Sequence, residues 1–383
     1  MRANGDRTYP NSLHNGTASL SKGHVRPEDR AILRAELLAW YGLNQRDLPW
    51  RREASPYAIW VSEIMLQQTR VVVVMERYQV FLKRFPTLVA LALSSEEEVL
   101  ALWSGLGYYR RARMLHKAAQ FVVGQLDGRL PGNAAELRKL PGIGAYTAAA
   151  IASIAYGEPV AVVDGNVERV LCRLENWEVT KSGEAALRHR IDALAAELLD
   201  PRNPGDFNQA IMELGATVCL PKNPQCLTCP WVKHCKTQGE HKTVPRARMV
   251  SQEVAYALSV RTGRQASRGS REVLLEKRPA ALTVMPGLWE LPALRDAEVP
   301  EDELRMTLRH AIMQVNYYVR IRTVFEDDAV PMTVVGGERR WVPLHEAADM
   351  ALTGLARKVL TRAHLLTGTS RDAMTPESGD ERT

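Results

Sequence analysis

The segment Leu140-Pro141-Gly142-Ile143-Gly144-Ala145-Tyr146-Thr147, followed by an alanine-rich run, indicates a tight turn between two helices. Gly142 and Gly144 let the backbone approach a ligand closely and turn its N–H groups outward. Because the next run predicts a helix over 147–155, these N–H groups would lie at a helix N-terminus, a suitable place for an anion. A lone Gly-x-Gly pair fits an ordinary helix–helix turn equally well.

A single acid, Asp164, follows this turn after an apolar run and directly before Gly165-Asn166. This order of residues predicts a phosphate-binding turn that is followed, at a fixed distance, by a carboxylate. Asp164 also suits the N-cap of a helix that begins near Val167. Capping and catalysis are compatible, so both interpretations stand at this point.

Composition bounds the class of protein. The chain has 383 residues, of which 45% are hydrophobic and 25% charged, which suits two domains with ample cores. Its net charge of +6 and its pI of about 9.1 suit a polyanionic partner without proving one. No window reaches the roughly eighteen apolar residues of a membrane span. We expect neither a membrane segment nor a signal peptide.

The pattern divides the chain into a mainly α region and a smaller α+β domain. We expect a disordered arm over 1–27, a helical domain over 28–235, a linker over 236–252, an α+β domain over 253–366 and a disordered tail over 367–383. Apolar residues recur at helical spacing in 31–41, 59–85, 99–103, 111–126 and 185–199. Strands are predicted over 254–260, 273–275, 317–325 and 340–342, and a last helix over 351–366.

Glu63 is an acid in an otherwise apolar helix. Three of its four neighbours at helical spacing, Ile59, Trp60 and Leu66, are apolar, and the fourth is Gln67. A carboxyl group in such surroundings is desolvated and holds its proton more tightly, which is what a general acid needs at neutral pH. The neutral groups of Gln67-Gln68-Thr69 beside it suit the hydrogen-bonding edges of bases. An ordinary helix surface is the alternative.

Four of the five cysteines lie close together, at Cys219, Cys226, Cys229 and Cys235. Prolines between them favour a loop, and four thiolates at this spacing fit either Zn²⁺ or a [4Fe–4S] cluster. Three lysines around this loop, Lys222, Lys233 and Lys236, suit contacts with the phosphates of a polyanion and equally suit a solvated face.

Six segments in order, at 49–50, 60–69, 105–109, 140–147, 164–169 and 207–215, resemble the MutY-type adenine DNA glycosylases. These enzymes are the iron–sulfur branch of the helix-hairpin-helix, endonuclease III-like superfamily. The resemblance implies that Glu63 protonates N7 of adenine and that Asp164 stabilises an oxocarbenium-like sugar. It further implies that Asn166 orients Asp164 and that Tyr146 lies beside the reacting centre.

The same resemblance implies DNA-binding roles. It predicts an adenine pocket lined by Arg46, Trp50, Leu66, Val71 and Gln209. It predicts that Gln68 and Tyr108 wedge into the base stack, although Trp50 and Tyr108 would also suit a protein core. It favours a [4Fe–4S] cluster on the four cysteines, and it implies a monomeric, cytoplasmic protein associated with the bacterial nucleoid.

The implied reaction is hydrolysis of the N-glycosidic bond of a flipped adenine paired with 8-oxoguanine or guanine in double-stranded DNA. Endonuclease III-type enzymes have a Schiff-base lysine where this chain has Tyr146, so we expect a monofunctional glycosylase. The alternatives are an endonuclease III-like glycosylase acting on oxidised pyrimidines and a catalytically inactive DNA-binding protein.

The segments 273–279 and 287–292 resemble a Nudix-like lesion-recognition domain. Scattered acids at Glu298, Glu301, Asp302 and Glu303 do not form the metal-binding array of a Nudix hydrolase, so we expect a binding domain. The family's Phe-Ser-His segment aligns with Ile312-Met313-Gln314, where serine and histidine are missing. We expect Gln314, which has both a donor and an acceptor, to replace them in part.

Overall fold

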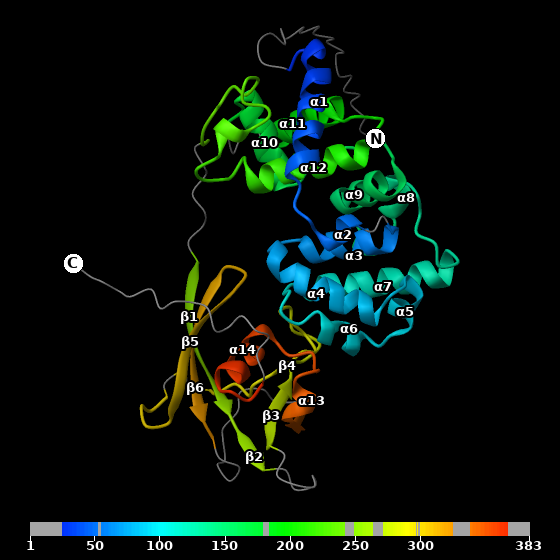
Figure 1. The fold of residues 1–383 in the computed structure, drawn as a ribbon. Helices are drawn as coiled ribbons and strands as arrows, with labels where there is room; N and C mark the ends of the chain where they lie inside the picture. The colour runs from blue at the N-terminus through cyan, green and yellow to red at the C-terminus, as the bar shows by residue number, and fades with distance from the viewer. Residues whose placement is uncertain are drawn as a thin grey trace, which may run out of the picture.

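The computed structural model describes residues 25–52, 55–178, 184–241, 249–262, 271–295, 297, 299–324 and 338–366. A helical region is followed by a C-terminal region of strands with two helices, and the two lie next to each other (Figure 1). No helix in these ranges is long and apolar enough to cross a membrane. The arm was predicted over 1–27, but Val25 is buried and the first helix begins at Pro27, so its end is wrong; residues 1–24 and the predicted tail at 367–383 lie outside the described residues.

The helices of the first region follow one another with short connections. They are α1 (Pro27–Asn44), α2 (Pro49–Arg52), α3 (Pro56–Leu66), α4 (Val71–Arg84), α5 (Leu88–Leu93), α6 (Glu96–Leu102), α7 (Arg110–Gln125), α8 (Ala134–Leu137), α9 (Ala145–Tyr156), α10 (Gly165–Glu175), α11 (Glu184–Leu198) and α12 (Pro204–Thr217), with a 3₁₀ turn η1 (Cys226–Thr228) in the cysteine loop. Side-chain caps from Thr87, Ser95 and Asn133 begin α5, α6 and α8 by accepting backbone N–H bonds.

Two hydrophobic cores build this region. The first joins residues between Leu48 and Ala152, from α2 to α9. The second joins α1 to residues between Val167 and Trp231, from α10 to the cysteine loop. The alanine-rich helix α9 packs against α3 on one side and α12 on the other. Small side chains allow this close approach, and at Gly205 a Cβ atom would meet the Ser153 carbonyl oxygen at 2.9 Å.

The Leu140–Gly144 turn connects α8 to α9 as predicted. Gly142 has a φ of +75°, and a Cβ atom there would lie 2.4 Å from Cβ of Met114 on α7. A larger residue is therefore excluded both by the backbone conformation and by the neighbouring helix. The turn therefore packs closely against α7.

The prediction of continuous helical spacing over 59–85 is wrong at its centre. The structure ends α3 at Leu66 and begins α4 at Val71, so Gln67, Gln68 and Thr69 lie in a turn. Gln68 has a φ of +54°, which no α-helix contains. The carbonyl groups at the end of α3 bind the side chain of Arg111, a long-range contact that apolar periodicity cannot reveal.

The C-terminal region contains two small sheets. Its strands are β1 (Val250–Leu258), β2 (Val260–Thr262), β3 (Arg271–Lys277), β4 (Trp289–Glu290), β5 (Leu304–Ile312), β6 (Val315–Thr323) and β7 (Arg339–Pro343), followed by helices α13 (Leu344–Ala347) and α14 (Gly354–Arg362). One sheet has the order β1-β6-β5, with β1 parallel to β6, and the other has β2-β3-β4 with β7 also paired to β3. The described strands and helices fit the predicted α+β class.

Several predictions for this region differ from the structure, and the linker predicted over 236–252 is wrong at its end because β1 begins at Val250. Strand β5 was not predicted, although its burial alternates over its whole length, with Leu304, Met306, Leu308 and Ile312 on the less exposed side. The last helix, predicted over 351–366, is shorter and covers Gly354–Arg362. Phe325, which was placed in a strand, lies outside the described residues.

The C-terminal region contacts the α6–α7 connection of the helical region. The hydroxyl of Tyr109 donates to the carbonyl oxygen of Leu352 at 2.9 Å, and Nε of Arg357 donates to Oγ of Ser104 at 2.7 Å. Leu288 and Ala351 also extend the first hydrophobic core of the helical region. Two apolar residues and several hydrogen bonds therefore join the regions.

Candidate active site

A cleft of about 790 Å³ lies between the two cores of the helical region. Most of the residues predicted from the sequence line it. These are Arg46, Trp50, Glu63, Leu66, Gln67, Gln68, Thr69, Val71, Gly142, Gly144, Tyr146, Asp164, Asn166 and Gln209. Trp50 fits both earlier interpretations, because it is buried against Tyr78 and also lines the cleft.

Glu63 lies on α3 with only 5% of its surface exposed. The pKa of Glu63 is raised to about 7, mainly by burial; the hydrogen bond from Tyr146 opposes the rise, and the nearby Asp164 carboxylate adds to it. The Tyr146 hydroxyl donates to Oε2 of Glu63 at 2.9 Å. The predicted desolvation of Glu63 is confirmed. At neutral pH this carboxyl group is available as a proton donor facing the cleft.

Asp164 caps α10 as the sequence suggested. Its Oδ1 accepts the backbone N–H groups of Asn166 at 2.9 Å and Val167 at 2.7 Å, while Nδ2 of Asn166 donates to Oδ2 at 3.0 Å. These bonds leave the carboxylate fixed at the wall of the cleft. Capping and a position in the cleft therefore occur together, and the side chain of Asn166 is hydrogen-bonded to the carboxylate of Asp164.

Asn166 is itself held from behind. Nη2 of Arg169 donates to Oδ1 of Asn166 at 2.9 Å, and Nε of Arg169 donates to the carbonyl oxygen of Cys219 at 2.8 Å. Gly215 lies so close that a Cβ atom there would be 2.7 Å from Cβ of Asn166. Gly215 and Arg169 fall within segments quoted above, but their support of Asn166 was not predicted.

Glu213 and Arg51 line the cleft and were missed by the sequence reasoning. Glu213 is 1% exposed and accepts hydrogen bonds from Arg46 at 2.7 and 2.8 Å and from Arg51 at 2.8 Å. Burial alone would raise the pKa of Glu213, but the two arginines outweigh it and lower the value to about 2. Glu213 is therefore ionised, and it fixes Arg46 in place.

Two predicted DNA-binding residues lie outside the cleft lining. Tyr108 is 49% exposed on the α6–α7 connection, so it is not a core aromatic. Gln314 lies in the β5–β6 turn beside Met313, and its carbonyl oxygen accepts the N–H of Val250. This turn lies at the end of the sheet that faces the helical region (Figure 1). The structure thus brings neither residue into the group around Glu63.

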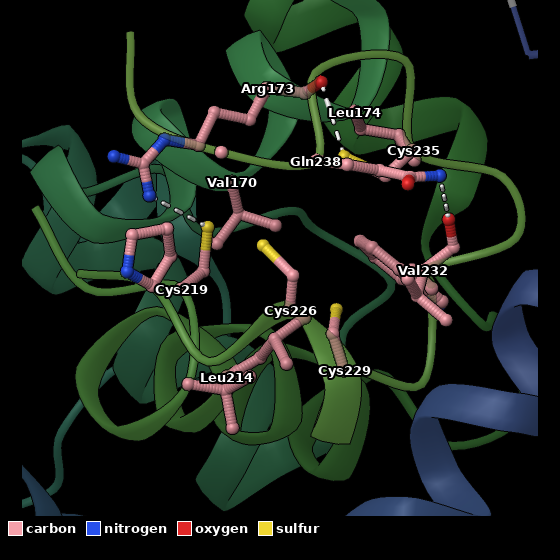
Figure 2. A pocket seen from close by; sticks show the side chains of 14 residues that line it. Val170, Arg173, Leu174, Leu214, Cys219, Cys226, Cys229, Val232, Cys235 and Gln238 are labelled. Carbon is pink, nitrogen blue, oxygen red and sulfur yellow. Dashed lines mark hydrogen bonds between the residues drawn. The ribbon is translucent and has the colours of Figure 1, made fainter.

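The four clustered cysteines line one pocket, and Figure 2 shows their sulfur atoms pointing toward its centre. All are free thiols, and Cys219 accepts a hydrogen bond from Arg173. Within the described ranges, no group of three or more His, Cys, Asp or Glu side chains is arranged to hold a metal ion. Lys236, one of the three lysines predicted to face DNA, is paired with the buried Glu175 at 2.7 Å.

Comparisons with known proteins place these features in a family context. A family model described as HhH-GPD superfamily base excision DNA repair protein matches residues 61–194. The chain is similar to an adenine DNA glycosylase of Homo sapiens, with 47% identity over 232 residues that cover 58% of this chain and 42% of the relative. It thus spans less than half the length of that relative.

A shorter relative and a solved structure extend the comparison. An adenine DNA glycosylase of Mycolicibacterium smegmatis is 44% identical over 208 residues, which cover 54% of this chain and 69% of that protein. The solved structure of a thermostable thymine-DNA glycosylase matches with a TM-score of 0.50 and 29% identity, covering 55% of this chain and 97% of that one. The similarity therefore covers a region large enough to contain the cleft.

Proposed function

This chain belongs to the adenine DNA glycosylase family, and from that premise we propose that it hydrolyses the N-glycosidic bond of adenine in mispaired double-stranded DNA. One observation carries the proposal: a buried carboxyl group with a pKa of about 7 and a second carboxylate line the same cleft. Breaking this bond leaves negative charge on the base and positive charge on the sugar. One acid and one carboxylate would stabilise the two ends separately.

Glu63 acts on the base side. Its proton passes to N7 of adenine as the bond lengthens, which makes the base a neutral leaving group. The Tyr146 hydroxyl remains a donor throughout, because burial and the neighbouring Glu63 hold the pKa of Tyr146 well above its usual value. Tyr146 therefore orients Oε2 and leaves the other oxygen of Glu63 for the base.

Asp164 acts on the sugar side. Its charge stabilises the oxocarbenium-like transition state, and the bonds from Asn166 and the α10 N-terminus keep it from rotating. Water then adds to the sugar. No lysine occupies the position of Tyr146, so the enzyme releases adenine without forming a Schiff base.

Adenine must leave the base stack to reach these groups, at a cost of a few kcal/mol. The Gly142–Gly144 turn binds a phosphate, while Gln68 and Tyr108 fill the space that the base leaves. The C-terminal region, Nudix-like by the resemblance of 273–279 and 287–292, binds the opposite base and does not hydrolyse nucleotides. That base is 8-oxoguanine or guanine, with Gln314 as one reader. We propose a monomer with an intracellular location.

Cys219, Cys226, Cys229 and Cys235 would hold a [4Fe–4S] cluster. Their sulfur atoms point into one pocket, and four thiolates are a donor set that such a cluster takes. The resemblance to the iron–sulfur branch of the family favours the cluster over Zn²⁺, which four thiolates also suit. When bound, it supplies structural closure of the loop. Protein purified anaerobically should contain about four irons per chain, whereas stoichiometric zinc without iron would overturn this assignment.

The deciding experiment is single-turnover base release from duplexes with adenine opposite 8-oxoguanine, guanine, cytosine or thymine. We expect release opposite 8-oxoguanine and guanine, with 8-oxoguanine preferred. A parallel duplex with an oxidised thymine tests the endonuclease III-like alternative. Binding to all duplexes without release of any base would support the inactive DNA-binding alternative.

A further inference from the structure

Arg111 joins two exposed turns at the edge of the helical region. It lies in the first turn of α7, and its Nη1 atom donates to the last carbonyl groups of α3 at 2.7 and 3.0 Å and also to that of Gln67. Its Nη2 atom donates to the carbonyl oxygens of Leu106 at 3.0 Å and Gly107 at 3.1 Å. One guanidinium group therefore binds the α3–α4 turn and the α6–α7 connection together.

Both turns contain a non-glycine residue in the left-handed backbone region. Gln68 has a φ of +54° and Tyr108 a φ of +47°. Such conformations cost free energy and persist only where the surroundings hold them. Two of the carbonyl groups that Arg111 binds belong to Gln67 and Gly107, the residues that directly precede Gln68 and Tyr108. Arg111 is thus bonded at the point where each turn is least favourable.

Two further contacts tie the turns to each other. The hydroxyl of Thr69 accepts from Nη2 of Arg111 at 3.0 Å and donates to the carbonyl oxygen of Leu106 at 3.1 Å. The guanidinium carbon of Arg111 lies 5.6 Å from the ring centroid of Tyr108, within the range of a cation–π contact. The two Nη atoms of a planar guanidinium group point toward both turns at once and suit these acceptors, whereas the single nitrogen of a lysine ammonium group does not.

We propose that Arg111 is a positioning residue that fixes the spacing between Gln68 and Tyr108, so that both side chains enter the base stack in concert as adenine leaves it. The proposal rests on the proposed function. Arg111 is not among the residues that line the cleft, so it acts through the two turns and touches no reacting atom.

The test compares two substrates in single-turnover base release. On a duplex with adenine opposite 8-oxoguanine, Arg111→Lys should release adenine at least tenfold more slowly than the parent. On a duplex whose adenine is already unstacked by flanking mismatches, the difference should shrink to about twofold, because less unstacking remains to be done. An equal loss on both substrates, or no loss on the first, would overturn the proposal.

Arg110→Lys is the matched control, since Arg110 is the exposed neighbour on the same helix and undergoes the same exchange. It should stay within about twofold of the parent on both substrates. If Arg111→Lys does not fold, Thr69→Val decides, because it removes only the hydroxyl that links the turns. It should show the same substrate pattern with a loss of about fivefold on the paired duplex.

A binding readout separates this proposal from the proposed function. A duplex with 2-aminopurine beside the adenine brightens when the wedge unstacks it, whether or not the base is cut. At saturating protein, Arg111→Lys should give less than half of the parent's increase. A parent that brightens this probe but releases no adenine would refute the proposed function alone, and a variant that matches the parent would refute the role of Arg111.

Discussion

Two buried glutamates, Glu63 in the helical region and Glu290 in the C-terminal region, are alike in most physical respects. They are 5% and 4% exposed, and burial raises the pKa of each to about 7. They differ in their partners. Glu63 lines the cleft and lies within electrostatic reach of Asp164, whereas Glu290 accepts from the Thr353 hydroxyl at 2.6 Å and from the Leu291 N–H at 3.0 Å.

The comparison shows what a raised pKa can and cannot indicate. Burial is the largest cause of the raised pKa in both carboxyl groups, so the shift by itself indicates burial and not catalysis. Both carboxyl oxygens of Glu290 already accept hydrogen bonds from protein groups, one at the end of β4 and one at the start of α14. What distinguishes Glu63 is that a substrate can reach it and that a second carboxylate faces the same space.

The largest expected difference is in catalysis. Glu63→Gln should lower single-turnover adenine release by about a thousandfold, because an amide cannot protonate the leaving base. Glu290→Gln is the matched exchange and should stay within about threefold. Duplex affinity measured at the same salt should be similar for both. A loss of adenine release in Glu290→Gln as large as that in Glu63→Gln would show that the two glutamates do not differ in their role in catalysis.

Asp164→Asn tests the second carboxylate. It removes the sugar-side charge but keeps a residue that caps helices well, so release should fall at least a hundredfold while thermal stability changes little. Asp164→Ser also keeps a helix-capping side chain but has no charge. It should therefore show the same loss of adenine release and the same small change in thermal stability as Asp164→Asn. Adenine release within tenfold of the parent in either variant would contradict the role assigned to Asp164.

The two glutamates should behave alike in stability. For each, the folded-state pKa lies above the unfolded value near 4.5, so the unfolded chain loses its proton first as pH rises. The stabilising effect is complete below about pH 4.5 and is lost by pH 7, a change of roughly 3 kcal/mol per group. Urea unfolding from pH 4.5 to 8 should show a flatter profile for Glu290→Gln and for Glu63→Gln. A profile as steep as the parent's would mean that neither group holds a proton.

The smallest effect concerns Tyr146. Its hydrogen bond lowers the pKa of Glu63, so Tyr146→Phe should raise that pKa further. The fall of kcat/KM at alkaline pH should move to higher pH, with the rate at pH 7 changed by less than about fivefold. Thr353→Val removes the equivalent bond to Glu290 and should leave the pH profile of release unchanged. An unmoved profile in Tyr146→Phe would show that Tyr146 does not act on Glu63.

Much of the cleft could be predicted from the sequence because its chemistry lies in local patterns. The apolar neighbours of Glu63 predicted that its side chain is buried. The position of Asp164 before Gly165-Asn166 predicted that it caps the helix that follows. Glu213 could not be found this way, since its partners Arg46 and Arg51 lie more than a hundred and fifty residues earlier and meet it only in the fold. Glu290 was likewise hidden within a segment singled out for a different resemblance.

The fold, like the cleft, was predicted where local patterns determine it and missed in other places. Helices with strong apolar spacing were predicted, and so were the division into two regions and the tight turn at Gly142. The break between α3 and α4 was missed, because it depends on Arg111 and on a backbone conformation that periodicity does not encode. Strand β5 was missed although Leu304, Met306, Leu308 and Ile312 alternate with more exposed residues, so its own period of two could have predicted it.

The two hydrophobic cores of the helical region have a consequence for the order of synthesis. The first is built almost entirely from consecutive residues between Leu48 and Ala152, so its contacts are local and can form while the chain is still on the ribosome. The second joins α1 to residues as late as Trp231 in the cysteine loop. Helix α1 is synthesised first, but its packing is complete only after this loop has been made. The last residue that lines the cleft is Ala216 on α12, so a chain truncated before α12 would present Glu63 without part of the opposite wall.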